Sequence, residues 1–190
     1  MTTSEPIGVF GGQFDPPHNG HLAVARAAIR QLGLDRLLIV PTPRPPHRPE
    51  PETAAEMRYE LARAAFAGEP GVELSRIELD RDGPSYTADT LAALAAPDRT
   101  LYLVVGADQL AALDGWHRPD QVRALATIAV AARPGAPHVD GVEVLAMEPV
   151  DASSSKIREL VAEGGDISAL VPPAVAIAIA RNGLYAQTPC

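Results

Sequence analysis

Short runs of apolar residues alternate along the chain with longer segments in which apolar residues recur every three or four positions. The short runs predict β-strands, and the longer segments predict amphipathic helices. Strands are expected over residues 7–10, 37–40, 72–79, 101–105, 127–131 and 142–147. Helices are expected from about residue 19 to 33, over 52–67, from 85 or 87 to about 96, from 106, over 120–125, from 153 and over 172–181. Met57 is expected to face inward in the second of these helices, and Ser85 or Thr87 to cap the third. Gly33 and Gly183 are expected to end the first and the last.

The character of the predicted strands indicates how the sheet is built. Residues 37–40 and 101–105 are apolar throughout, as in strands that are buried on both faces of a parallel sheet. Residues 72–79 alternate between apolar and polar side chains, which indicates a half-exposed or edge strand. The order strand, helix, strand at the start of the chain implies a right-handed crossover between parallel strands. We therefore predict an α/β fold, a Rossmann-like open parallel sheet with helices on both faces.

Length and composition narrow the class of protein further. The chain has 190 residues and no linker-like stretch, so residues 1–190 are predicted to form one domain, with a small helical C-terminal part from about residue 151. A net charge of −8 argues against a broad surface for nucleic acid or membranes. The chain lacks a signal peptide or a bilayer-length apolar run, and its single cysteine is Cys190. We expect a cytoplasmic protein with neither nucleic-acid nor membrane partners.

Candidate chemistry first occurs directly after the first predicted strand. That strand breaks at Gly11 and Gly12, and the chain then turns through residues 15–17 into a helix. Such a junction directs backbone N–H groups and the positive end of the helix dipole at one point, which suits an anion. His18 and His21 lie at this point, three residues apart and on one side of the first turn. We predict that the phosphates of a nucleotide bind and react here.

This junction differs from the two best-known phosphate loops. Residues 14–17 occupy the second half of a Gly-x-Gly-x-x-Gly pattern, and no Gly-Lys-Ser or Gly-Lys-Thr follows. A lone histidine is more often structural, and a zinc site needs a third ligand that the chain does not offer in a recognisable spacing. We therefore predict no metal-ligating residues. Imidazole N–H groups can instead bind phosphate oxygens and carry positive charge as negative charge develops.

Further candidates lie downstream, and each also has a purely structural interpretation. Residues 106–110 form a second junction of strand, glycine and helix, in which Asp108 could be a simple N-terminal helix charge. Trp116 could be a core residue, and the serines of residues 153–158 could be a helix cap. Arg158 could lie on a solvated helix face. It is their joint occurrence that favours one nucleotide site.

Two motifs of the chain resemble those of the His-x-x-His nucleotidyltransferase superfamily. Residues 11–22 resemble its first signature, and residues 153–158 resemble its second motif near the C-terminus. More narrowly, the chain resembles the bacterial nicotinate-nucleotide adenylyltransferases. This closer resemblance rests on blocks that occur in the family's order, at residues 45–48, 84–90, 106–110 with Trp116, 133–135 and 183–185.

The resemblance implies a nucleotidyltransferase-type fold and transfer of AMP from ATP to nicotinate mononucleotide. The products would be nicotinate adenine dinucleotide and pyrophosphate in NAD biosynthesis, with Mg²⁺ accompanying ATP. The implied catalytic residues are His18, His21 and Arg158. The implied ATP-binding residues are Gly11, Gly12, Phe14, His18, His21, Gly106, Asp108, Ser153, Ser154 and Arg158. The implied pyridine nucleotide-binding residues are Gln13, Arg48, Thr87, Trp116, His117 and Arg133.

The resemblance also implies a role for most of these side chains. The two histidines would contact the ATP phosphates, the paired serines would hold the β/γ end, and Arg158 would neutralise its charge. Asp108 would bind a ribose hydroxyl of the nucleotide. Trp116 would stack on the pyridine ring, and the backbone around Thr87 and His117 would receive the nicotinate carboxylate.

The chain departs from the family pattern at four positions, Gln13, Arg48, His117 and Ser155. None of these departures removes a charge that the chemistry needs, but His117 bears on the preference for nicotinate over nicotinamide. Two alternatives stay open: another adenylyl- or cytidylyltransferase of the same fold, such as a phosphopantetheine adenylyltransferase, and a non-catalytic dinucleotide-binding protein. The sequence also leaves a homo-oligomer open.

Overall fold

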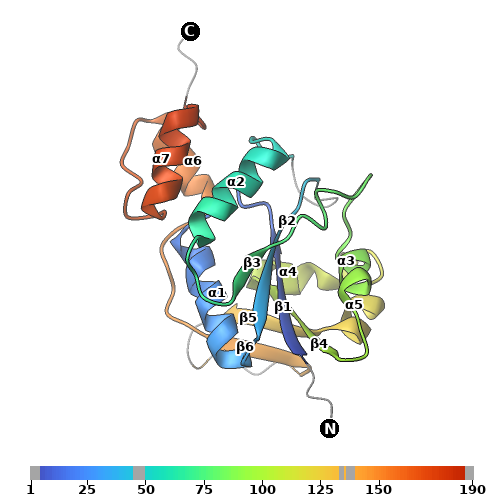
Figure 1. The fold of residues 1–190 in the computed structure, drawn as a ribbon. Coiled ribbons are helices and arrows are strands. Elements are labelled where there is room, and N and C mark those ends of the chain that lie inside the picture. The colour runs from blue at the N-terminus through green and yellow to red at the C-terminus, as the bar shows by residue number, and fades with distance from the viewer. Residues whose placement is uncertain (1–4, 45–49, 133–134, 136–139, 187–190) are drawn as a thin grey trace.

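A computed structural model describes residues 5–44, 50–132, 135 and 140–186 of the chain (Figure 1). These residues form a six-stranded sheet in the order β3-β2-β1-β4-β5-β6, and every neighbouring pair is parallel. The strands are β1 (Glu5–Gly12), β2 (Arg36–Pro41), β3 (Val72–Leu74), β4 (Arg99–Val105), β5 (Thr127–Ala132) and β6 (Val142–Ala146). The predicted fold class is confirmed.

Helices cover both faces of this sheet (Figure 1). They are α1 (Asn19–Leu32), α2 (Ala55–Phe66), α3 (Thr87–Leu94), α4 (Ala107–Ala112), the 3₁₀ helix η1 (Leu113–Gly115), α5 (Pro119–Leu125), α6 (Ser154–Ala162) and α7 (Pro173–Asn182). Successive residues of β1 serve the two faces, because Phe10 packs with α1 and α2 whereas Val9 packs with α3 and α5. Burial on both faces explains the uninterrupted apolar runs of the central strands.

The connections of β1 place a crevice at one end of the sheet. The chain passes from β1 to β2 on one side, and later returns to β4 on the other side of β1. In such open sheets, ligands bind beyond the carboxyl ends of the strands at the point where the order reverses. Gly11 and Gly12 end β1 at this point, and Gly106 follows β4 there.

Several local expectations differ from the structure. The strand predicted over residues 72–79 ends at Leu74, because the following residues turn away and place Glu78 in a buried hydrogen bond to Thr90. The expectation that Ser85 or Thr87 caps α3 is wrong, since Tyr86 holds the cap position without a side-chain bond.

Other caps and stops agree with the sequence. The side chain of Ser153 accepts a hydrogen bond from the Lys156 N–H at 3.2 Å, as expected for a serine cap of α6. Gly33 and Gly183 end α1 and α7 in the left-handed conformation, which matches the predicted stops.

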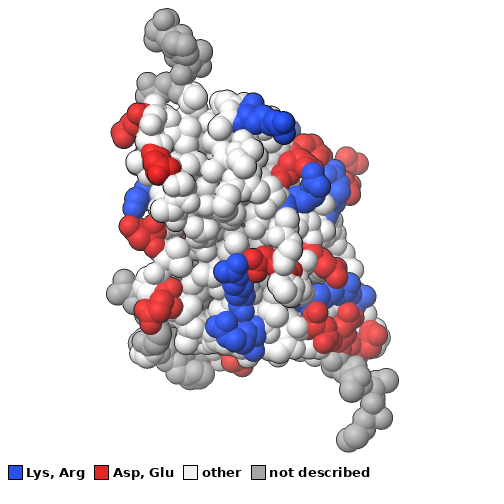
Figure 2. All heavy atoms as spheres, turned by 60° about the vertical axis from the view of Figure 1, so that its left-hand side comes forward, with Lys and Arg blue, Asp and Glu red and all other residues white. Residues whose placement is uncertain are grey.

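The surface carries charges of both signs. On the face drawn in Figure 2, the basic and acidic side chains of the described residues lie among one another, with uncharged surface between them. Within the described part of the chain, no helix combines the length and the apolar character that crossing a bilayer requires.

Candidate active site

Two cavities meet at the carboxyl ends of β1 and β4. The larger cavity, of about 1450 Å³, is lined by the loop after β1, the first turn of α1 and the start of α6. The smaller cavity, of about 170 Å³, lies between β1, β4, the start of α3 and Trp116. The residues that line both cavities are Gly11, Gly12, Gln13, Val105, Asp108 and Gln109. A ligand that spans this boundary would contact both halves of the crevice.

The structure divides the predicted site residues between these two cavities. The larger cavity is lined by all the predicted ATP-binding residues: Gly11, Gly12, Phe14, His18, His21, Gly106, Asp108, Ser153, Ser154 and Arg158. The smaller cavity is lined by the predicted pyridine-binding residues Gln13, Thr87, Trp116 and His117. Arg48 and Arg133 lie outside the described residues. The imidazoles and the guanidinium from opposite ends of the chain therefore share one cavity.

The two histidines form a fixed pair at the start of α1. Their ring centroids are 3.8 Å apart, and the backbone N–H of His18 donates a hydrogen bond to Nδ1 of His21 at 3.1 Å. Because Nδ1 of His21 accepts, the neutral ring carries its proton on Nε2. The buried ring of Phe14 packs edge-on against His21, with 5.0 Å between centroids. These two contacts thus hold the Nε2–H donor of His21 in one orientation.

Burial determines the charge of this pair. Desolvation lowers the pKa of His18 from 6.5 to about 4. Desolvation, together with the neighbouring His18, lowers the pKa of His21 well below its usual value. Both imidazoles are therefore neutral N–H donors at pH 7. Nδ1 of His18 is buried and has no hydrogen-bond partner among the described residues, which suits a ligand atom at this position.

Gly20 is a site residue that the motif analysis did not single out. A Cβ atom at this position would lie 2.9 Å from Nδ1 and 3.0 Å from Cε1 of His18. Real Cβ contacts are longer, so a side chain here would displace the ring. The glycine between the two histidines thus allows the imidazole of His18 to lie close to the helix backbone.

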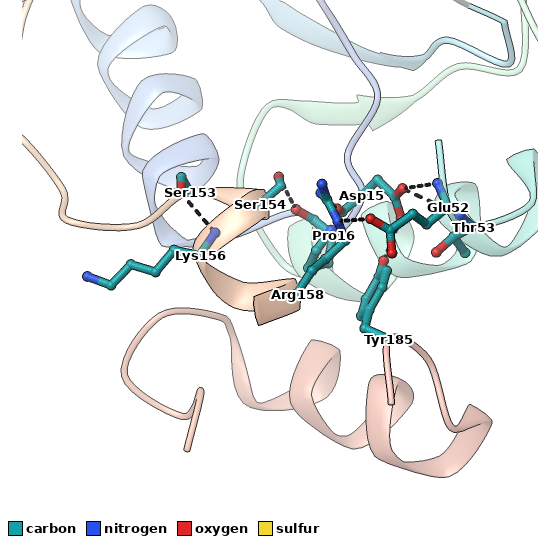
Figure 3. A network of polar contacts seen from close by, with 9 residues as sticks. All are labelled: Asp15, Pro16, Glu52, Thr53, Ser153, Ser154, Lys156, Arg158 and Tyr185. Atoms are coloured by element: carbon teal, nitrogen blue, oxygen red, sulfur yellow. Dashed lines mark hydrogen bonds and ion pairs between the residues drawn. The ribbon is translucent and has the colours of Figure 1, made fainter. Parts of the chain in front are cut away.

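The start of α6 is attached to the loop after β1 (Figure 3). Arg158 donates from Nη1 to the carbonyl of Asp15 at 2.8 Å and from Nε to the carboxylate of Glu52 at 2.7 Å. Ser154 donates from its hydroxyl to the carbonyl of Pro16 at 2.9 Å. These bonds bring the C-terminal motif beside the first motif, although the two are far apart in sequence.

The N-terminus of α1 is less open than the sequence suggests. The backbone N–H of Asn19 donates to the carbonyl of Leu170 at 2.9 Å, and its side-chain amide donates to the carbonyl of Ala169 at 3.0 Å. The segment before α7 therefore takes up one of the N–H groups that the sequence offered to an anion. Fewer backbone N–H groups at the start of α1 therefore remain available to a ligand than the sequence predicts.

An aromatic wall borders the smaller cavity. Trp116 is half-buried: it packs against an apolar core cluster and also lines the cavity. His117 stacks on Tyr86 with 4.2 Å between ring centroids. Nε of Arg118 donates to Nε2 of His117 at 2.7 Å, which keeps the imidazole in place.

The smaller cavity also contains buried polar groups that sequence reasoning missed. Glu78 accepts a hydrogen bond from the Thr90 hydroxyl at 2.8 Å, and burial raises the pKa of its carboxyl group. Oε2 of Glu78 and Oγ of Ser85 are buried without a partner among the described residues. Neither group is conspicuous in the sequence. Glu78 lies in the segment that was predicted to be an edge strand, and Ser85 was predicted to be a helix cap.

Comparisons with known proteins agree on a nucleotidyltransferase. The model of the cytidylyltransferase-like family matches residues 9–160. A protein of Gemmatimonas aurantiaca named "Probable nicotinate-nucleotide adenylyltransferase" is 40% identical over 96% of this chain and 93% of its own length. A protein of Thermus thermophilus with the same name is 42% identical over 94% of this chain and 98% of its own.

Solved structures resemble the fold at much lower identity. The nicotinic acid mononucleotide adenylyltransferase of Plasmodium falciparum, described as complexed with NaAD, superposes with a TM-score of 0.80. The alignment covers 95% of this chain and 97% of that one, at 16% sequence identity. This likeness concerns the fold.

Proposed function

The chain belongs to the cytidylyltransferase-like family and, within it, to the nicotinate-nucleotide adenylyltransferases, and on this premise we propose that it transfers AMP from ATP to nicotinate mononucleotide. The products are nicotinate adenine dinucleotide and pyrophosphate, in NAD biosynthesis. The observation that carries the proposal is the pair of cavities that meet at Gly11, Gly12 and Asp108. The larger cavity is lined by phosphate-binding types of side chain, and the smaller one is lined by Trp116.

The larger cavity suits ATP. His21 presents an N–H donor, His18 a buried ring nitrogen without a partner, and Arg158 a guanidinium, all on one cavity of about 1450 Å³. Charge-assisted and N–H hydrogen bonds of this kind are strong with phosphate oxygens. Asp108, at the boundary with the smaller cavity, is proposed to bind a ribose hydroxyl, and Ser153 and Ser154 the β/γ end of the triphosphate.

The smaller cavity suits the pyridine ring. Its volume of about 170 Å³ is that of a cavity for one six-membered ring, since an apolar cavity of about 150 Å³ in another protein binds benzene. Trp116 is proposed to stack on this ring. The backbone near Thr87 and His117 is proposed to receive the carboxylate. The mononucleotide phosphate would then reach the boundary where both cavities share Gly11 and Gly12.

The chemistry requires charge stabilisation rather than a general base. A phosphate oxygen of the mononucleotide is already ionised at pH 7, because its second pKa is about 6. This oxygen attacks the α-phosphorus of ATP, the new P–O bond forms, and the bond from the α-phosphorus to the bridging oxygen breaks to release pyrophosphate. His18, His21 and Arg158 are proposed to stabilise the charge on the transferring group and on pyrophosphate, which is the main catalytic contribution in such reactions.

We propose that Mg²⁺ arrives with ATP. Among the described residues, no group of three or more His, Cys, Asp or Glu side chains is arranged to hold a metal ion. Proteins usually bind Mg²⁺ through one or two carboxylates together with substrate phosphates, and Glu50 and Glu52 line the larger cavity. These two carboxylates fit that arrangement, and the bound ion would offset phosphate charge. The use of ATP as a substrate also supports our expectation that the protein is cytoplasmic.

The direct test is an assay of pyrophosphate release combined with product identification by mass spectrometry. The protein is incubated with ATP, Mg²⁺ and one acceptor: nicotinate mononucleotide, nicotinamide mononucleotide or phosphopantetheine. We expect release of pyrophosphate and formation of nicotinate adenine dinucleotide with the first acceptor. Turnover of phosphopantetheine alone would indicate another adenylyltransferase. Binding of a dinucleotide without any pyrophosphate release would indicate a non-catalytic binding protein.

A further inference from the structure

Tyr185, which follows α7, contacts Asp15 in the loop after β1, and the proposed function does not use this contact. Its hydroxyl donates a hydrogen bond to Oδ1 of Asp15 at 2.6 Å, across 170 positions of sequence (Figure 3). Burial and the bond to Asp15 raise the pKa of the phenol, so the hydroxyl keeps its proton and remains a donor at working pH. The contact therefore persists as a donor–acceptor pair.

The backbone after α7 is shaped to direct Tyr185 at Asp15. Gly183 ends α7 with a left-handed φ of 59°, and the N–H of Leu184 donates back to the carbonyl of Ile179 at 3.1 Å. Tyr185 itself has a φ of 63°, which is unfavourable for a residue with a Cβ atom. Leu184 packs against the apolar core beside α1 and α2. The left-handed backbone at residues 183 and 185 turns the chain back toward the loop after β1.

Asp15 is the centre to which these contacts converge. The residue is only 3% exposed, and its Oδ2 accepts from the backbone N–H groups of Glu52 at 2.8 Å and of Thr53 at 3.4 Å. Its backbone carbonyl accepts from Arg158, whose Nε is bound to the Glu52 carboxylate. The position of Asp15 therefore determines where both acceptors of Arg158 lie.

We propose that Tyr185 is a positioning residue: by holding Asp15, it aligns the carbonyl and the Glu52 carboxylate that orient the Arg158 guanidinium toward the larger cavity. The inference rests on the proposed function, because it assigns Arg158 to the transferring phosphates. Tyr185 acts through Asp15 and touches no substrate itself. Its loss should therefore affect the rate of transfer more than the binding of the pyridine nucleotide.

The first experiment removes only the hydroxyl. In Tyr185→Phe, we expect kcat for pyrophosphate release to fall at least about tenfold, while KM for nicotinate mononucleotide changes by less than about twofold. Tyr102→Phe is the matched control, because Tyr102 lies on β4 and lines neither cavity. This control should keep its kcat. An unchanged kcat in a folded Tyr185→Phe protein would overturn the proposal.

The second experiment is a double-mutant cycle that a merely structural role would not satisfy. In the background of Arg158→Gln, Tyr185→Phe should change kcat by less than about twofold, because the residue that it positions is gone. Multiplication of the two single effects would overturn the proposal. Should Tyr185→Phe not fold, Asp15→Asn takes its place in the cycle, with the same expected non-additivity. An inactive wild-type protein would contradict the proposed function instead.

Discussion

At the scale of single residues, two neutral imidazoles are placed where phosphate is proposed to bind. Burial keeps both rings uncharged at pH 7, with the pKa of His18 at about 4. A bound polyphosphate would favour the charged form of either ring, because a nearby anion raises the pKa of a histidine. Positive charge would then develop only when the nucleotide is present.

His21 is expected to contribute most to transfer, because its N–H is held in one orientation by His18 and Phe14. In His21→Ala we expect kcat to fall at least about a hundredfold, the usual effect of removing one donor to a transition state. Steady-state pyrophosphate release, with circular dichroism to confirm folding, measures this. A near-normal kcat in the folded variant would contradict the role assigned to His21.

The lowered pKa of His18 predicts a pH dependence of stability. Between pH 6.5 and about 4 the unfolded chain binds a proton at this residue that the folded chain does not. Above pH 6.5 this residue therefore does not lower the free energy of unfolding. As the pH falls from 6.5 towards 4, the free energy of unfolding should decrease by up to about 1.4 kcal/mol per pH unit for one such group.

Urea denaturation of the wild type and of His18→Asn at several pH values tests this. The variant should show a weaker decrease of stability on acidification. Equal pH dependence in both proteins would mean that the ring is not desolvated as the structure indicates.

Trp116 distinguishes a ligand-stacking role from a core role. In Trp116→Ala we expect KM for the pyridine mononucleotide to rise much more than KM for ATP, because the residue lines only the smaller cavity. Initial-rate kinetics with each substrate varied in turn measure both constants. Equal rises for both substrates would assign Trp116 to the core alone.

At the scale of elements, α2 shows how a buried cation organises the loops of the site. Arg58 is 1% exposed, and its guanidinium donates to the carbonyls of Thr53 at 3.0 Å, Gln13 at 2.7 Å, Thr42 at 2.8 Å and Pro43 at 3.0 Å. It therefore holds the ends of β1 and β2 against the start of α2. Burial lowers the pKa of Arg58, and the charge of Asp15 opposes this effect.

Replacing this guanidinium should be costly. We expect Arg58→Met to lower the free energy of unfolding by about 3–5 kcal/mol, because it leaves four backbone carbonyls without their donor and removes the cation that offsets the charge of buried Asp15. Arg63→Met on the same helix is the matched control, since Arg63 is exposed and pairs with Glu60 at the surface. That change should stay below about 1 kcal/mol in urea denaturation. Equal losses in both variants would contradict the role of Arg58.

Hydrophobic periodicity predicted the elements well where packing follows it. The central strands and α1 appear as expected, because their apolar residues serve one or two buried faces. On α2 the periodicity predicted an inward Met57, whereas the structure buries Arg58. Likewise, residues after Leu74 leave the sheet to bury Glu78. In both cases a polar network that only the folded chain brings together overrides the local pattern.

At the scale of the whole molecule, the motifs near the two ends of the chain meet at one crevice. Short-range patterns identified His18, His21 and Arg158, but not the contacts that join them. Asp15, Glu52 and Tyr185 do so through bonds that span most of the sequence. Spacing along the chain carries no information on such long-range pairs.

We propose that the imidazoles of His18 and His21 and the guanidinium of Arg158 surround one triphosphate. A crystal structure with a non-hydrolysable ATP analogue tests it most directly. We predict phosphate oxygens within about 3 Å of a ring nitrogen of His18, of Nε2 of His21 and of the Arg158 guanidinium. A triphosphate bound outside the larger cavity, or one contacted by neither the histidines nor Arg158, would contradict the account.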